Sequence, residues 1–155
     1  MKVQEYDLRL REDGTCYLHK HGRPESKSEY VYVDTPDAIY EFMESQYKLS
    51  SLAYEVIYMI AVNTKSRILG VFPISMGTVD VSILSPRDVL MRALLVGAKG
   101  IILVHNHPSG IPLPSTADID STRRVKEAAQ LMNINLLDHI IIGKYLYSMS
   151  KNGEI

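Results

Sequence analysis

The segment GIILVHNHPSGIPLPSTAD, residues 100–118, is the most informative part of the chain. It begins with an apolar run over residues 100–104, which is typical of a buried strand. A loop rich in proline follows, and Ser115 stands as a capping residue before a helix that we expect to end near Met132. A buried strand, a loop and a capped helix in this order indicate a strand–helix unit of an α/β domain.

The sequence on either side of this stretch alternates between helix and strand patterns. Thr35-Pro36 and Ser85-Pro86 each combine a capping residue with a proline in the first turn, so each predicts the start of a helix. We expect strands over residues 54–62, 67–74, 136–142 and 145–149, short strands within residues 3–33 around a turn at 13–14, and a polar loop over residues 19–24. This order predicts an α/β fold with a mixed sheet and some parallel pairing.

Length and composition indicate an ordinary globular protein. The 155 residues suit one compact body, within which we expect a soft boundary near residue 50. Residues 1–50 would form strands plus one helix packed on a main domain, and residues 51–155 would form that domain. Hydrophobic residues make up 46% and charged residues 23%, which excludes a disordered chain.

Charge and cysteine content narrow the class of partner and the compartment. The formal net charge of −1 gives no general attraction to nucleic acid or anionic lipid. Cys16 is the only cysteine, so neither an internal disulfide nor a cysteine-based zinc cluster can form. The N-terminal sequence lacks the apolar core of a signal peptide, and no apolar run is long enough to span a bilayer. We therefore expect a soluble cytoplasmic protein without a membrane partner, and the sequence leaves its oligomeric state open.

Two histidines and one aspartate within residues 100–118 have the pattern of a metal site. His105 and His107 stand two residues apart at the end of the predicted strand, so their imidazoles lie on one face. Neutral imidazole is a common zinc ligand, and Asp118 in the first turn of the next helix can supply a carboxylate. Three protein ligands leave a fourth position for water, whose pKa zinc lowers toward about 7. The pattern predicts one zinc ion per chain.

A hydrolytic zinc site also needs a group that moves protons. Glu55 is the only charged residue in a long apolar segment, where a carboxylate is costly unless it is paired or functional. It can accept a proton from water and deliver it to a leaving amine. Ser115 can donate a hydrogen bond to a developing oxyanion. We therefore assign Glu55 and Ser115 as the catalytic candidates.

Structural alternatives remain open for each of these residues. Ser115 and Asp118 also form the pattern of a capping box, which can coexist with a metal site. Glu55 can instead pair with a buried basic group such as Arg87 or Arg92 and have no catalytic role.

The other histidines allow similar alternatives. His105 and His107 can be loop histidines bonded to the backbone. We expect His139 to be structural rather than a ligand, because the predicted site is already complete. His19 and His21 belong to a solvated loop, with adventitious metal binding as the alternative.

The ordered motif resembles a known family. His-x-His-Pro, followed by a serine and then by an aspartate three residues later, is similar to the JAMM motif of JAB/MPN metallopeptidases. The similarity is greatest to the RadC branch and covers about residues 50–149. The residues that carry it are His105-Asn106-His107-Pro108-Ser109-Gly110, Pro114-Ser115, Asp118, Asp138-His139, Gly77-Thr78, Pro86-Arg87 and Asn63-Thr64-Lys65-Ser66-Arg67.

The resemblance implies both a fold and an activity. The fold would be of MPN/JAB type, a mixed sheet flanked by helices and layered as in cytidine deaminase. His105, His107 and Asp118 would hold zinc, Glu55 would be the general acid and base, and Ser115 would stabilise the transition state. The activity would be zinc-dependent cleavage of an amide bond, of metallopeptidase or isopeptidase type, in a peptide or protein substrate that the sequence does not identify.

Two alternatives to this activity stay open. RadC takes its name from a supposed role in DNA repair, so the chain can instead be an accessory protein of DNA repair with a structural or inactive metal site. The near-neutral charge gives such a nucleic-acid partner little support. A nuclease or phosphoesterase is a further option, but its usual two-metal arrangement needs more carboxylates near the histidines.

Overall fold

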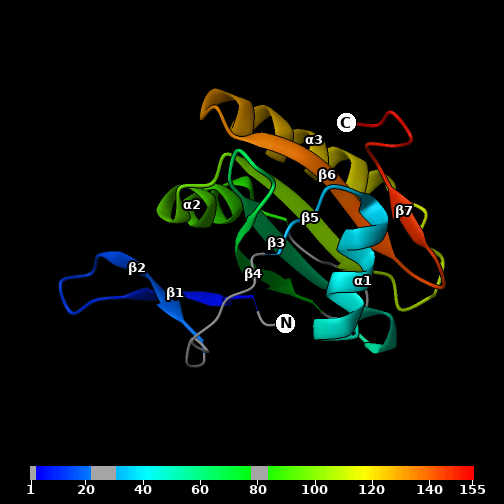
Figure 1. Ribbon diagram of the computed structural model, residues 1–155, viewed down its shortest axis with the longest axis horizontal. Helices are drawn as coiled ribbons and strands as arrows, with labels where there is room; N and C mark the ends of the chain where they lie inside the picture. Colours follow the sequence, from blue (N-terminus) through cyan, green and yellow to red (C-terminus); the bar gives the residue numbers. More distant parts are fainter. Residues whose placement is uncertain (1–2, 22–30, 78–83) are drawn as a thin grey trace.

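One main sheet and one separate hairpin contain the strands of the computed structural model, which describes residues 3–21, 31–77 and 84–155 (Figure 1). The main sheet has the order β4-β3-β5-β6-β7. Its strands are β3 (Val56–Val62), β4 (Ile68–Met76), β5 (Gly100–Asn106), β6 (Asn135–Ile142) and β7 (Leu146–Ser148). Strands β5 and β6 run parallel, whereas the other neighbours are antiparallel. The predicted α/β fold with a mixed sheet is confirmed.

Helices cover both faces of this sheet, and the hairpin extends away from it. Helix α1 (Pro36–Tyr47) packs on one face, and helices α2 (Pro86–Val96) and α3 (Thr116–Leu131) pack on the other. A short 3-10 helix, η1 (Leu49–Ser51), follows α1. The hairpin consists of β1 (Tyr6–Leu10) and β2 (Cys16–Lys20), and it lies on the side of β4 (Figure 1). None of the helices in the described ranges is long and apolar enough to cross a membrane.

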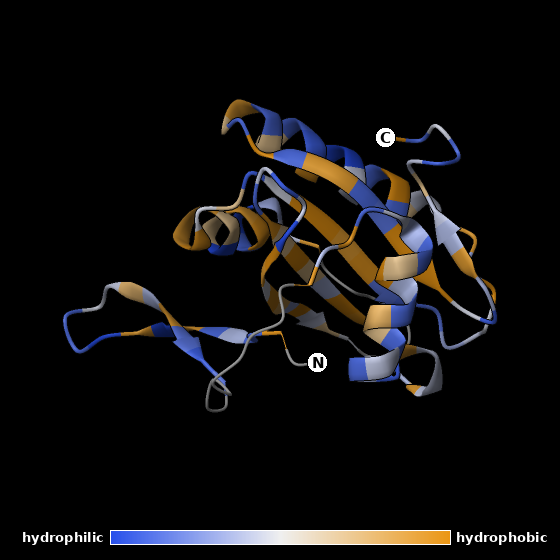
Figure 2. Ribbon diagram, viewed as in Figure 1, coloured by the Kyte–Doolittle hydropathy of each residue, from blue (hydrophilic) through white to orange (hydrophobic). Residues whose placement is uncertain are grey.

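The alternation of side chains along β5 assigns the site to one face of the sheet. Ile102 and Val104 pack into the core under α1, whereas Ile101 and Leu103 pack into the core under α2 and α3. Because successive side chains of a strand point to opposite faces, His105 follows Leu103 and lies on the α3 face. Figure 2 shows that hydrophobic residues line most of the central strands, so β5 is buried on both faces.

Local capping signals place the helix starts where the sequence predicts them. The Thr35 side chain accepts a hydrogen bond from the backbone of Ala38, and Pro36 opens α1. Ser85 caps α2 in the same way, and α2 ends at Gly97, which has a φ of 70°. Glycine at this position avoids the strain that a side chain would suffer at positive φ.

Several strand ends differ from the prediction because pairing between strands decides them. Strand β5 continues through His105 to Asn106, since β3 still pairs with it at His105 and β6 pairs with it as far as Asn106. Glu55, predicted inside a strand, lies immediately before β3. His19, predicted in a loop, lies in β2, where it pairs with Asp7.

Two predicted features reach beyond the described ranges. Residues 22–24 of the predicted polar loop lie outside the described residues, as does Thr78 of the family-like pair. Helix α1 contacts the main sheet through Ile39, Phe42 and Met43. The predicted division of the chain near residue 50 stays a prediction.

Candidate metal centre

Four predicted site residues from separate elements meet at one end of the sheet. His105 is the last but one residue of β5, and His107 follows that strand. Asp118 lies in the first turn of α3, and Glu55 precedes β3. Each offers one ligand atom, and these atoms all lie within 4.8 Å of one another. The two histidine Nε2 atoms are 2.9 Å apart.

Both carboxylates face the pair of imidazoles. Asp118 Oδ1 lies 3.5 Å from His105 Nε2, and Asp118 Oδ2 lies 3.6 Å from His107 Nε2. Glu55 Oε1 lies 3.8 Å from His105 Nε2 and 3.6 Å from His107 Nε2. The side chains of His107, Glu55 and Asp118 are 16%, 17% and 18% exposed, so the group is half-buried with an opening to solvent.

Strand register and one buried amide place Glu55 beside the histidines. Antiparallel pairing sets Ile57 opposite His105, which brings the residue before β3 alongside the end of β5. The Asn106 side chain accepts from Val56 N at 2.9 Å and donates to the Tyr54 carbonyl at 3.0 Å. Asn106 therefore ties the residues on both sides of Glu55 to β5. This role of Asn106 could not be predicted from the sequence, because its partners lie about fifty positions away and only the strand register brings them together.

The loop after β5 is fixed to the neighbouring β6–β7 turn. His107 N donates to the Ile142 carbonyl at 2.8 Å, and Lys144 N donates to the Gly110 carbonyl at 2.9 Å. A Cβ on Gly143 would lie 2.5 Å from that same Gly110 oxygen, so only glycine allows this close approach. The turn therefore holds the loop that carries His107.

Asp118 serves the helix cap and the histidine cluster together. The backbone of Asp118 donates to Ser115 Oγ at 3.1 Å, and the backbone of Ser115 donates to Asp118 Oδ2 at 2.7 Å, which completes a capping box. The Ser115 hydroxyl also donates to Asp118 Oδ2 at 2.6 Å. Ser115 is exposed and contacts the cluster through Asp118. The predicted capping box is confirmed, and the metal site remains a prediction that this geometry allows.

The surroundings shift the pKa of each group in the cluster. Burial lowers the pKa of His105 well below its ordinary value, and the neighbouring His139 lowers it further. The Asp118 carboxylate beside His107 raises the pKa of this imidazole against the effect of burial. Burial by itself would raise the pKa of Asp118, but the neighbouring His107 and His105 and the hydrogen bonds from Ser115 lower it overall. Burial raises the pKa of Glu55, which the nearby His107 partly offsets.

The donor set fits a divalent cation of the zinc type. His107 Nδ1 lies 2.8 Å from the Ile111 carbonyl oxygen, which can only accept, so this nitrogen carries the proton of the neutral ring. The other nitrogen, Nε2, then presents a lone pair toward His105 Nε2. A cation between two imidazole nitrogens and carboxylate oxygens satisfies all of them, and zinc takes these ligand types.

The structure shows which charged side chains lie near Glu55. Among the described residues, the ion pairs of Glu55 are those to His105 and His107. Arg92 instead donates to the Asp88 carbonyl, and Arg87 lies 3.8 Å from the Asp88 carboxylate. The arginine pairing considered for Glu55 is therefore not what the structure shows.

The remaining histidines stand outside the group of four. His139 is 1% exposed, and its Nε2 lies 2.7 Å from His105 Nδ1, so it contacts a member of the group without joining it. Burial lowers the pKa of His139 to about 4. His21 pairs with Asp7 on the exposed hairpin.

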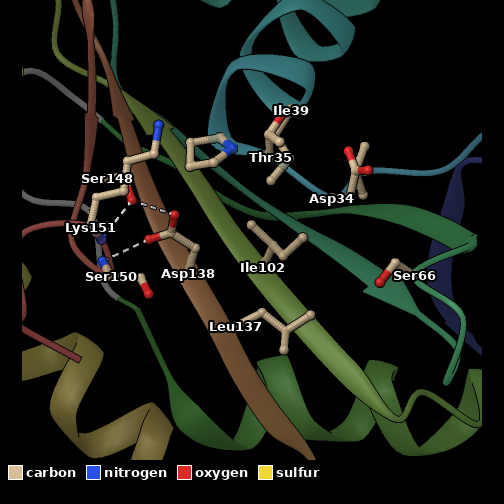
Figure 3. A pocket seen from close by; sticks show the side chains of 12 residues that line it. Asp34, Thr35, Ile39, Ser66, Ile102, Leu137, Asp138, Ser148, Ser150 and Lys151 are labelled. Carbon is tan, nitrogen blue, oxygen red and sulfur yellow. Dashed lines mark hydrogen bonds between the residues drawn. The ribbon is translucent and has the colours of Figure 1, made fainter.

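A pocket of about 330 Å³ lies on the α1 face, opposite the histidines, and Figure 3 shows its lining. None of the four clustered residues lines it. Its buried acid, Asp138, accepts hydrogen bonds from Ser148 Oγ at 2.6 Å, from His139 N at 2.8 Å and from Ser150 N at 3.0 Å. Asp138 therefore anchors β6 to the segment that begins with β7.

Comparison with known proteins gives a family match and several relatives. The family model for the RadC-like JAB domain matches residues 33–154. An UPF0758 protein of Carboxydothermus hydrogenoformans is 40% identical over 116 residues, which cover 75% of this chain and 50% of the relative. An UPF0758 protein of Clostridium acetobutylicum is 37% identical over 137 residues, 88% of this chain and 59% of the relative. One of Thermotoga maritima is 35% identical over 124 residues, 79% of this chain and 54% of the relative. The chain spans about half the length of these relatives.

Proposed function

The chain belongs to the RadC-like JAB domain family, and from this premise we propose that it is a zinc-dependent hydrolase that cleaves an amide bond. The activity would be of the metallopeptidase or isopeptidase type. The observation that carries the proposal is the meeting of Glu55, His105, His107 and Asp118, whose ligand atoms lie within 4.8 Å of one another.

His105, His107 and Asp118 are the proposed zinc ligands. They supply two imidazole nitrogens and one carboxylate, the number of protein ligands that a catalytic zinc site uses. When bound, zinc would polarise the scissile carbonyl and lower the pKa of a coordinated water to about 7. The half-buried setting excludes part of the solvent and strengthens these electrostatic effects.

Glu55 is the proposed general base and acid. Burial raises the pKa of its carboxyl, which brings it closer to the pH at which proton transfer is efficient. Glu55 takes a proton from the attacking water as the new carbon–oxygen bond forms. It then delivers that proton to the leaving amine as the carbon–nitrogen bond breaks. Such proton transfer typically contributes a factor of about 10² to 10⁴ in rate.

Ser115 is the proposed donor to the oxyanion of the tetrahedral intermediate. Its hydroxyl is exposed and donates to Asp118 Oδ2. To serve the substrate, the hydroxyl must rotate from Asp118 toward the substrate oxygen. The backbone part of the capping box keeps Ser115 in place while this happens.

The test compares peptide cleavage and DNA binding in the same preparations. Zinc-loaded protein is assayed against a peptide library and against labelled DNA, alongside Glu55→Gln and the matched surface variant Glu41→Gln. We expect peptide cleavage by the parent and by Glu41→Gln, and a loss of about 10² to 10⁴ in rate for Glu55→Gln with zinc binding retained.

The other outcomes of this test overturn parts of the proposal. Cleavage that survives Glu55→Gln would remove Glu55 from the mechanism. Tight DNA binding without cleavage of any peptide would replace the hydrolase with an accessory protein of DNA repair.

A further inference from the structure

A chain of hydrogen bonds runs behind His105 into the core, through residues that the proposed mechanism does not use. His105 Nδ1 lies 2.7 Å from His139 Nε2, and His139 Nδ1 lies 2.6 Å from Thr122 Oγ1. The Thr122 hydroxyl in turn lies 2.6 Å from the Asp118 carbonyl oxygen. We propose that His139 is a positioning residue that, with Thr122, fixes the tautomer of His105 so that His105 Nε2 is free to bind the metal.

The direction of the chain follows from its carbonyl end. A carbonyl oxygen can only accept a hydrogen bond, so at 2.6 Å the hydroxyl proton of Thr122 must point toward the Asp118 oxygen. The Thr122 hydroxyl has a single proton, which this hydrogen bond to the Asp118 carbonyl occupies. At its 2.6 Å contact with His139 Nδ1, Thr122 Oγ1 must therefore accept, and His139 Nδ1 must carry the proton.

The protonation state of His139 in turn fixes that of His105. A neutral imidazole has one protonated and one unprotonated nitrogen. Both rings are 1% exposed, where a charged ring is costly, so each ring is in its neutral form. With its proton on Nδ1, His139 presents an unprotonated Nε2 to His105. His105 must then place its own proton on Nδ1, and its Nε2 is left with a lone pair toward Asp118 and His107.

Burial makes this control of the tautomer effective. His105 and His139 are each 1% exposed and Thr122 is 0% exposed, so bulk solvent does not compete for these hydrogen bonds. Pairing of β6 with β5 sets Leu103 opposite His139 and fixes the position of His139 along the strand. His107 uses a different device, because its Nδ1 faces the Ile111 carbonyl. Loss of His139 would therefore release the tautomer of His105 and leave that of His107 unchanged.

The inference rests on the zinc ligands of the proposed function and not on amide cleavage. Its first test is nitrogen NMR of the histidine rings in the metal-free protein. We expect the proton of His105 on Nδ1. A proton on Nε2 of His105 would overturn the inference, whether or not the protein hydrolyses a peptide. A parent protein that binds no zinc would overturn the proposed function, and the ring spectrum would still decide the tautomer.

The second test measures zinc affinity by competition with a chelator. His139→Leu removes the acceptor for His105 Nδ1, and we expect zinc affinity to fall by about 10- to 100-fold, the usual effect of losing such an outer partner. His139→Gln can still accept from His105, so it should recover most of the affinity. Equal affinity and an unchanged His105 spectrum in His139→Leu would reduce His139 to a packing residue and overturn the inference.

A second pair of variants tests whether this hydrogen-bond chain fixes the His105 tautomer if His139→Leu does not fold. Thr122→Val keeps the shape of the side chain and removes the acceptor of the His139 proton, whereas Ser121→Ala removes another hydroxyl that donates to the same Asp118 carbonyl. We expect lower zinc affinity and a mixed His105 tautomer in Thr122→Val, and neither change in Ser121→Ala. The same result in both variants would contradict the inference.

Discussion

Replacing Asn106 by alanine should destabilise the protein strongly although Asn106 is not a proposed metal ligand. The side chain is 1% exposed and makes two hydrogen bonds to the backbone around Glu55, one from Val56 N and one to the Tyr54 carbonyl. Val56 is 2% exposed, so its N–H would be left buried without the acceptor that it has in the parent. Losing the partner of a buried donor costs about 1–3 kcal/mol, whereas the carbonyl of the exposed Tyr54 can turn to water.

The cost of the unpaired Val56 N–H and the lost packing contacts of the amide together give an expected decrease of about 2–4 kcal/mol in the free energy of unfolding of Asn106→Ala. The assay is urea denaturation of the metal-free protein. Asn63→Ala is the matched control, because Asn63 also accepts two backbone hydrogen bonds, from Lys65 and Arg67, but in a turn on the solvent side. We expect the control to lose about 1 kcal/mol or less. Equal losses in the two variants would refute the role of Asn106 in holding the segment that carries Glu55.

Three other perturbations have defined outcomes. Ser115→Ala should lower the free energy of unfolding by about 1 kcal/mol through loss of the helix cap. It should also slow peptide cleavage by about 10²-fold or more with zinc content unchanged. An unchanged rate of cleavage would exclude Ser115 from the mechanism. In the metal-free protein, burial holds the pKa of His139 at about 4 against 6.5 in the unfolded chain, so the unfolded chain binds more protons between these values. The contribution of this histidine to the free energy of unfolding is therefore complete above pH 6.5 and falls by about 3 kcal/mol as the pH drops to 4. Denaturation curves measured across this pH range should show a smaller fall in His139→Gln. Gly143→Ala should cost about 1–3 kcal/mol by pushing a Cβ against the Gly110 carbonyl, and thermal unfolding with no loss would contradict the close approach seen there.

Features encoded by neighbouring residues could be predicted from the sequence. Thr35 and Ser85 cap their helices within three positions and Pro36 and Pro86 fit the first turn, so the helix starts follow from local chemistry. The spacing of His105 and His107 likewise reflects the local period of a strand. These features require no knowledge of which strands are neighbours.

Features that depend on strand pairing could not be predicted in the same way. The hydrogen bonds of the Asn106 side chain form because β3 and β5 pair in one register, which brings positions about fifty residues apart into contact. The contact of His139 with His105 needs β6 beside β5 in parallel, and Thr122 reaches it because α3 packs on that face. The sequence indicates that His139 is structural, and only the topology shows that it touches a proposed ligand.

Zinc content shows whether the proposed metal centre binds a metal ion. Protein purified without a chelator is analysed for zinc beside His107→Ala, with His21→Ala as the control for adventitious binding on the hairpin. We expect one zinc ion per chain in the parent and in His21→Ala, and no zinc in His107→Ala. Equal zinc in the parent and His107→Ala would contradict the claim that these side chains form a metal centre.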